Sequence, residues 1–124
     1  MYIHLIAAAV CVVLAGVMLK AGVPKVLLSG PIPAYLQTHM GLSTAMVRFI
    51  GLCEVCGALG LIVGIFWRPI GIAAAIGLAA LLIGAVGFHA KAGDYANAQT
   101  RRGATPPVVL TVGSIAAALL LVAA

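Results

Sequence analysis

Four long apolar stretches limit what this chain of 124 residues can fold into. They cover residues 2–22, 44–66, 70–90 and 106–124, and as helices each is long enough to cross a hydrocarbon layer about 30 Å thick. Only 7% of the chain is charged and 65% is hydrophobic, whereas about a quarter of a soluble domain is charged. The sequence therefore predicts an integral membrane protein.

The connections between these stretches set the topology. Pro24, Pro31 and Pro33 in residues 23–43 argue against one uninterrupted helix there, although residues 34–40 can form a short interfacial helix. A tight turn at Phe66-Trp67-Arg68-Pro69 joins the second and third spans, and the polar residues 91–105 form an aqueous loop. We expect a single membrane domain over residues 1–124, all-α, folded as a four-helix up-down-up-down bundle.

Basic residues gather on one side of this bundle. The net charge of +5 comes from seven Lys and Arg against Glu54 and Asp94. Six of the bases lie in or beside the loops 23–43 and 91–105, and the exception is Arg68; the six are Lys20, Lys25, Arg48, Lys91, Arg101 and Arg102. The positive-inside rule then predicts a multi-pass protein of the plasma membrane with both loops in the cytoplasm and both termini outside. Nucleic acid is not needed to explain the basic composition.

Glu54 is the only glutamate and lies near the middle of the second span. A charge at the centre of a membrane helix costs about 2.5 to 3.5 kcal/mol, so its carboxyl group needs a partner or a function. Lys25 and His89 are the partner candidates, and we expect a polar cavity with Lys25 and Arg48 near its mouth and Glu54 at its floor. Candidate ligand-binding residues are Lys25, Arg48, Glu54 and His89, and candidate catalytic residues are Glu54 and His89.

Each of these residues also has a structural interpretation. Glu54 can form a hydrogen bond that only ties helices together, and Lys25 and Arg48 can be ordinary positive anchors at the membrane surface. His89 lies near the water interface, where a histidine can reach out of the membrane without binding a ligand. Both interpretations stay open for every residue of the set.

The cysteine pair Cys53-x-x-Cys56 suggests redox thiols. However, the pair lies in mid-membrane, where thiol ionisation is disfavoured, and cysteine is also a common buried small residue. Because His4 and His89 are expected near opposite faces, we predict no metal site. Ala73, Gly77, Ala80 and Gly84 recur every three or four residues and predict a smooth face for close helix contact.

Several short motifs together resemble the DoxX-like family of small four-helix membrane proteins. They are Gly22-Val-Pro-Lys25, then Arg48 with Gly51-x-x-Glu54-x-x-Gly57-Ala58-x-Gly60-Leu61, the proline turn at Pro69, and Gly84-Ala85-x-x-x-His89 followed by Lys91 and Asp94. The resemblance covers nearly the whole chain. It implies the four-helix membrane fold and selects Lys25, Arg48, Glu54 and His89, whereas Cys53 and Cys56 are not part of the pattern.

The resemblance also implies a place in redox systems, since the family is named for a membrane subunit of a thiosulfate:quinone oxidoreductase. Our leading hypothesis is an accessory or assembly subunit of a membrane-associated oxidoreductase system, not catalytic alone, with a protein partner or a second copy of itself in the lipid bilayer. One alternative is a redox enzyme that binds a quinone or another small apolar molecule through Glu54 and His89. The other is a small proton-coupled transporter with Glu54 as the coupling acid.

Overall fold

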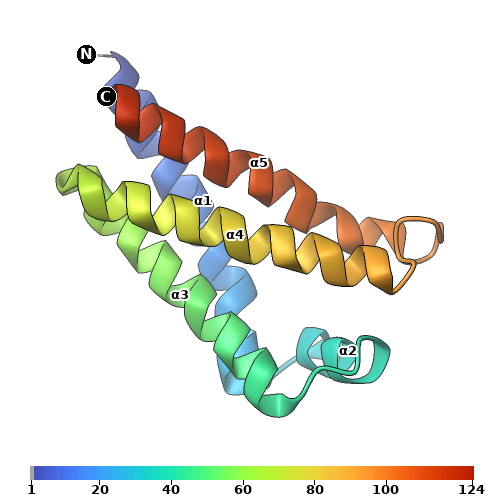
Figure 1. Cartoon of the computed structure of the whole chain (residues 1–124). Helices are drawn as coiled ribbons and strands as arrows, with labels where there is room; N and C mark the ends of the chain where they lie inside the picture. The colour runs from blue at the N-terminus through green and yellow to red at the C-terminus, as the bar shows by residue number, and fades with distance from the viewer. Residues whose placement is uncertain (1) are drawn as a thin grey trace.

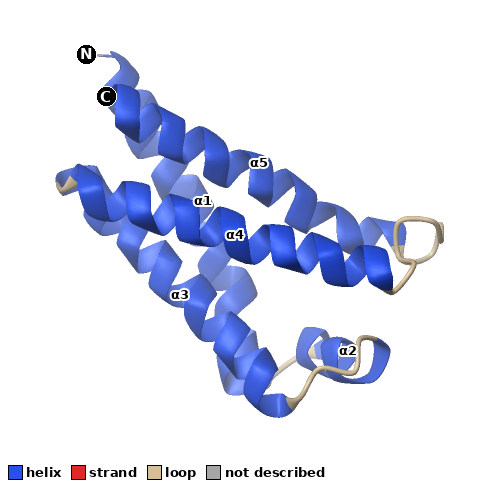
Figure 2. Cartoon of the chain, viewed as in Figure 1, coloured by secondary structure: helices blue, strands red, loops and turns tan. Residues whose placement is uncertain are grey.

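The computed structural model describes residues 2–124 and contains five helices in that range, without a strand (Figures 1 and 2). The helices are α1 (Tyr2–Leu27), α2 (Pro31–His39), α3 (Thr44–Phe66), α4 (Arg68–Lys91) and α5 (Arg101–Ala123). The predicted all-α fold class is confirmed. Four of the helices, α1, α3, α4 and α5, are long and apolar enough to cross a membrane, and the chain is a membrane protein with four candidate spans.

The four long helices form a closed ring of contacts. α1 packs most extensively against α3, α3 packs against α4, and α4 packs against α5, while a less extensive contact between α1 and α5 closes the ring. Successive long helices run in opposite directions, so both termini lie at one end of the bundle and α2 lies at the other (Figure 1). At the end with the termini, Arg68 donates a hydrogen bond to the carbonyl oxygen of Ala124.

Glycines set the closest approaches between neighbouring helices. A Cβ atom built on Gly64 of α3 would lie 2.2 Å from the Cα atom of Gly71 in α4, so these two backbones touch beside the turn at Trp67. Further along the same helix pair, a Cβ atom on Gly60 would lie 2.7 Å from the Cβ atom of Ala74. Small residues let membrane helices approach closely, and here they hold the α3–α4 hairpin together.

The predicted small-residue face of α4 does not contribute to these contacts. Ala73, Gly77, Ala80 and Gly84 are all exposed, and nothing lies within 4 Å of a Cβ atom built on Gly77 or Gly84. Within the described residues this face does not pack in the core, because the apolar residues Ala75, Leu78 and Leu82 turn the opposite side of α4 toward it. Close contact of the small-residue face with a helix of another copy stays a prediction.

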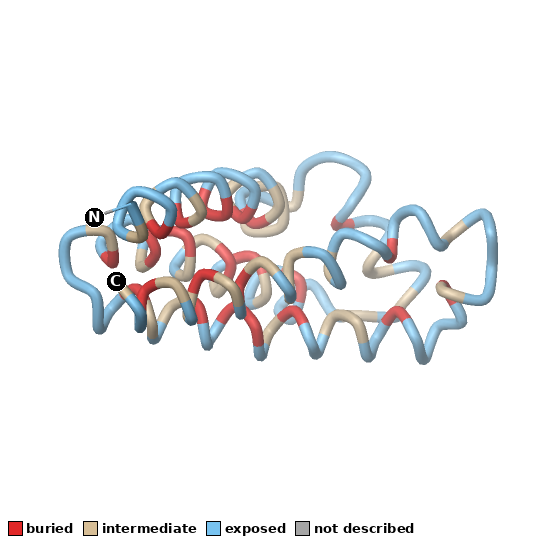
Figure 3. The backbone as a smooth tube through the Cα atoms, turned by 90° about the horizontal axis from the view of Figure 1, so that it is seen from above, coloured by how far each residue is buried: buried red, intermediate tan, exposed pale blue. Residues whose placement is uncertain are grey.

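Burial follows the inner sides of the helices. Buried residues lie where the helices face one another, and the outer sides are exposed (Figure 3). The core includes Met18 of α1, Leu61 of α3 and Leu78 of α4, each at most 2% exposed. Large aliphatic and aromatic residues such as Val13, Phe49 and Val109 point outward, which suits a surface covered by lipid chains.

Two helix ends differ from the residue ranges expected for the spans. α1 does not stop near residue 22 but continues through Pro24 to Leu27, where Ser29 N donates to the carbonyl oxygen of Pro24 at 2.9 Å. α5 starts at Arg101 and not at Pro106, because the carbonyl oxygens of Asn97 and Thr100 accept the amide hydrogens of Arg101 and Ala104. The positions at which the helices enter and leave the membrane stay predictions.

Candidate functional site

Glu54 and Lys25 form a buried ion pair between α3 and α1. The ammonium group of Lys25 donates to Oε1 of Glu54, and the two side chains are 14% and 4% exposed. Glu54 lies near the middle of α3, whereas Lys25 lies in the last turn of α1. Of the two partner candidates for Glu54, the structure selects Lys25.

Two glycines bring these side chains together. A Cβ atom on Gly51 would lie 2.6 Å from Cβ of Lys25 and 2.7 Å from the carbonyl oxygen of Gly22. A Cβ atom on Gly22 would lie 2.8 Å from the carbonyl oxygen of Gly51 and 2.9 Å from Cβ of Glu54. The backbones of α1 and α3 therefore touch at this crossing, and the lysine reaches the carboxylate because no side chain separates the helices.

The end of α1 is shaped so that Lys25 stays helical. Leu28 has a positive φ of 52°, and its amide donates to the carbonyl oxygen of Lys25 at 3.4 Å. Together with the bond from Ser29 to Pro24, this is the hydrogen-bond pattern of a Schellman motif, in which glycine usually takes the left-handed position. A leucine in the left-handed conformation costs about 1 to 2 kcal/mol.

A second polar network surrounds Asp94 in the loop that follows α4. Its side chain is 1% exposed. Nδ1 of His89 lies 2.6 Å from Oδ2 of Asp94, and Nε2 of His39 lies 2.7 Å from Oδ1. Since an ionised carboxylate only accepts, both ring nitrogens donate to it. Tyr35 adds a longer bond, with its hydroxyl oxygen 3.5 Å from Oδ2.

The Asp94 network joins parts of the chain that are distant in sequence. Tyr35 and His39 come from α2, where their rings stack with centroids 4.7 Å apart, and His89 comes from the last turn of α4. The hydroxyl of Thr100 donates to the backbone carbonyl of Asp94 at 3.0 Å and fixes the loop from the other side. The network therefore fastens α2 to the α4–α5 loop.

Electrostatics around Asp94 favour its charged form. Burial raises the pKa of Asp94, but the hydrogen bonds from His89 and His39 and the charges of these histidines lower it by more than burial raises it. The pKa of Asp94 therefore lies below its usual range. The reverse holds for its aromatic neighbours: burial, with the negative charge of Asp94, raises the pKa of Tyr35 and of Tyr95. Both tyrosines thus remain neutral donors, and Tyr95 gives its hydrogen bond to the carbonyl oxygen of Ala104 at 2.9 Å.

The predicted site residues do not form one cluster. Glu54 bonds to Lys25 and His89 bonds to Asp94, so the two candidate catalytic residues belong to separate networks. Arg48 is exposed on the outer side of α3 and takes part in neither network. Whether Lys25, Arg48, Glu54 and His89 bind a ligand stays a prediction.

None of the three cysteines takes part in either network within the described residues. Cys53 is partly buried and Cys56 is exposed, and both are free thiols, as is the buried Cys11. Within residues 2–124, no three or more His, Cys, Asp and Glu side chains are grouped so that they could hold a metal ion. His39, His89 and Asp94 do not form such a group, because the two histidines bind different oxygen atoms of the carboxylate.

Sequence reasoning missed His39 and the central role of Asp94. A signal for them was present: both loops were assigned to the same membrane side, and these loops contain Asp94, His39 and Tyr35. Asp94 is the only acid of the chain outside the apolar stretches. A pair of histidines around Asp94 could have been expected from that placement, but the fold of residues 31–39 was needed to see it.

Comparison with known proteins gives one match. A model of the DoxX-like family matches residues 9–117 of the chain, a range that contains all four candidate site residues and Asp94. No curated protein matches the chain, and no solved structure matches it.

Proposed function

The chain belongs to the DoxX-like family, and from this premise we propose that it is an accessory or assembly subunit of a membrane-associated oxidoreductase system. One observation carries the proposal: both acids of the chain are used inside the fold. Glu54 fastens α1 to α3, and Asp94 fastens α2 to the α4–α5 loop. Such a chain is built to hold a rigid shape in the membrane.

The pairing of Glu54 supports a structural role for the acid. At this tight glycine crossing, the charge of the Glu54 carboxylate is neutralised by the ammonium group of Lys25. A buried ion pair can specify how elements pack. A coupling acid in a transporter instead exchanges its partner during each cycle. The crossing at Gly22 and Gly51 leaves little room for such an exchange.

The basic end of the bundle is the surface that we propose for a partner. Arg48 and Lys91 are exposed there, close in sequence to the loops predicted to be cytoplasmic, and neither is in an ion pair within the described residues. Charge complementarity steers partners to a surface and fixes their orientation. We therefore expect a partner that presents acidic residues at the membrane surface.

Purification of the tagged chain from membranes of its own host tests the proposal. The expected result is a fixed stoichiometric complex with a protein that contains a redox cofactor, and quinone-linked activity that disappears when the chain is deleted and returns when it is restored. Arg48→Gln with Lys91→Gln should release the partner at lower salt than the wild type does. The matched control is Arg68→Gln, which removes one base from the opposite end and should retain the partner.

Three results would contradict this proposal. The first is a chain that always purifies alone, from every mild detergent. The second is quinone turnover by the purified chain in liposomes, which would favour the enzyme alternative based on Glu54 and His89. The third is substrate movement driven by a proton gradient and abolished by Glu54→Gln, which would favour the transporter alternative.

A further inference from the structure

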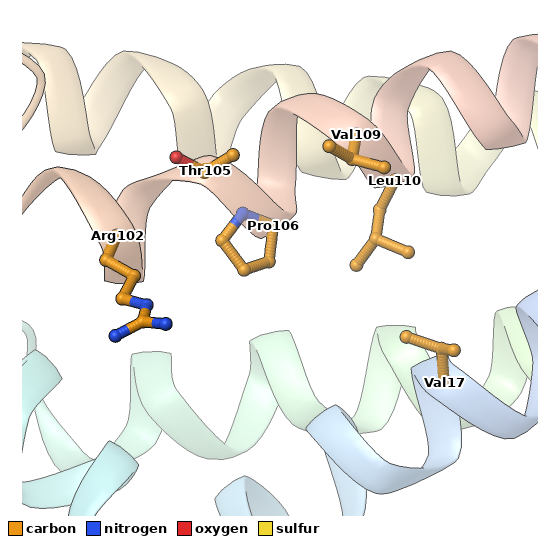
Figure 4. A pocket seen from close by; sticks show the side chains of 6 residues that line it. All are labelled: Val17, Arg102, Thr105, Pro106, Val109 and Leu110. Carbon is orange, nitrogen blue, oxygen red and sulfur yellow. The ribbon is translucent and has the colours of Figure 1, made fainter.

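The contact between α1 and α5 leaves a groove on the outer surface of the bundle. The groove has a volume of about 430 Å³ and is lined by Val17 of α1 and by five residues of α5, namely Arg102, Thr105, Pro106, Val109 and Leu110. Pockets of about 300 to 1,000 Å³ hold small molecules in proteins. Figure 4 shows Arg102, Pro106 and Leu110 extending from α5 into the gap, with Arg102 at one end and Leu110 opposite Val17 at the other.

The groove has an apolar part and a charged end. Val17 and Val109 are 41% and 61% exposed, so the apolar part opens toward the lipid. Arg102 lies in the first turn of α5, near the end of the bundle that we expect to meet the cytoplasm. A groove with this arrangement is complementary to a membrane lipid that lays a chain along α5 and places its head group beside Arg102.

The charge on Arg102 has no counterpart within the described residues. Glu54 is paired with Lys25, and Asp94 accepts from His39 and His89, so neither acid of the sequence is free for it. Its position makes this more costly, because a helix N-terminus disfavours positive charge and the first turn of α5 contains no acidic residue. An anion that neutralises Arg102 must therefore come from outside the chain.

We propose that the α1–α5 groove binds an anionic phospholipid, with an acyl chain against Val17, Pro106 and Val109 and the phosphate group beside Arg102. We expect an anionic head group because basic pockets between membrane helices on the cytoplasmic side bind anionic lipid head groups.

Native mass spectrometry of the purified chain, titrated with phosphatidylglycerol or phosphatidylcholine, tests the proposal. The wild type should retain phosphatidylglycerol in preference to phosphatidylcholine. Arg102→Gln should weaken phosphatidylglycerol binding about fivefold, as expected for the loss of one base beside an anionic head group. Val109→Trp should fill the groove and reduce the binding of both lipids. Because Arg102 and Val109 are both exposed, circular dichroism should show an unchanged helix content in each variant.

The control is Arg68→Gln, which removes one exposed base at the opposite end of the bundle, beside the termini. It should leave phosphatidylglycerol binding unchanged. Equal losses in Arg68→Gln and Arg102→Gln would show that only net charge matters and would overturn the proposal. Binding that survives Val109→Trp would also overturn it, as would a dimer that cross-links through positions 17 and 109 and excludes lipid, since the groove would then hold a second copy of the chain.

Discussion

Lys25 and Glu54 meet from unequal depths in the bundle. The carboxylate is almost fully enclosed, whereas the lysine lies in the last turn of α1 and keeps 14% of its side chain exposed. A lysine near a helix end can extend toward the membrane surface if its partner is lost, but a carboxylate in mid-helix has no such route. The two members of the pair should therefore respond differently to substitution.

We expect Lys25→Met to lower the free energy of unfolding by about 3 kcal/mol, because it leaves the buried carboxylate of Glu54 without a partner. Glu54→Gln should cost only about 1 kcal/mol, since the amide oxygen still accepts from Lys25. The double variant Lys25→Met/Glu54→Gln should lie within about 1 kcal/mol of the wild type. Unfolding in mixed micelles, followed by circular dichroism, measures the free energy of unfolding of the wild type and the three variants. Strictly additive losses in the double variant would show that the pair contributes no coupling energy.

Asp94 predicts a pH dependence for the docking of α2. The groups that face its carboxylate are Tyr35 and His39 from α2 and His89 from α4. Because the pKa of Asp94 is lower in the folded chain than in the unfolded one, its stabilisation is present above about pH 4 and is lost as the pH falls below that value. Hydrogen exchange of residues 31–39, corrected for intrinsic rates, should accordingly increase at low pH.

The variant Asp94→Asn should raise the exchange of residues 31–39 already at neutral pH, because an amide accepts more weakly than a carboxylate. Tyr35→Phe is the matched control: its bond to Asp94 is long at 3.5 Å, so its loss should change exchange far less. If Asp94→Asn and the wild type exchanged alike over the whole pH range, Asp94 would not be what holds α2 in place.

At the scale of helices, the crossing of α1 and α3 depends on glycine. In Gly51→Ala the new Cβ atom would meet the carbonyl oxygen of Gly22 at 2.7 Å and the amide nitrogen of Val26 at 2.9 Å. These are backbone atoms, so the helices must move apart, which should cost about 1 to 3 kcal/mol and lengthen the bond between Lys25 and Glu54.

The matched control is Gly77→Ala in α4, where nothing lies within 4 Å of the added Cβ atom. An alanine in a helix interior should stabilise by about 0.5 to 1 kcal/mol relative to glycine. The same mixed-micelle unfolding compares the two variants. A loss of equal size in both would mean that glycine serves helix flexibility in general and not this crossing.

The lengths of the apolar stretches predicted the long helices well, whereas the positions of the prolines predicted the helix ends less well. The four long helices were predictable because only helices and closed barrels satisfy the backbone in a membrane, and these apolar runs have the length of a helical span. The end of α1 was not, because Pro24 keeps a helical φ and packing of Gly22 against α3 compensates for its missing hydrogen bond. The two polar networks were only partly predictable, since pairing depends on how helices distant in sequence cross.

On the scale of the whole molecule, the Asp94 network closes the end of the bundle at which α3 and α4 diverge. α2 lies between these two helices at that end in Figure 1, and its side chains His39 and Tyr35 reach the loop after α4. The Asp94 network therefore lies at the same end of the molecule as the exposed bases Arg48 and Lys91. The charge difference between the two ends then predicts how the chain is inserted.

We expect this base-rich end in the cytoplasm and both termini outside, because short loops that are rich in lysine and arginine are retained on the cytoplasmic side. Alkaline phosphatase fused after Ala124 should be active in cells, whereas the same enzyme fused after Asn97, in the α4–α5 loop, should be inactive. Green fluorescent protein at the same two positions is the matched control and should give the opposite pattern. Active phosphatase at position 97 would reverse the orientation and would place both Arg102 and the proposed partner surface outside the cell.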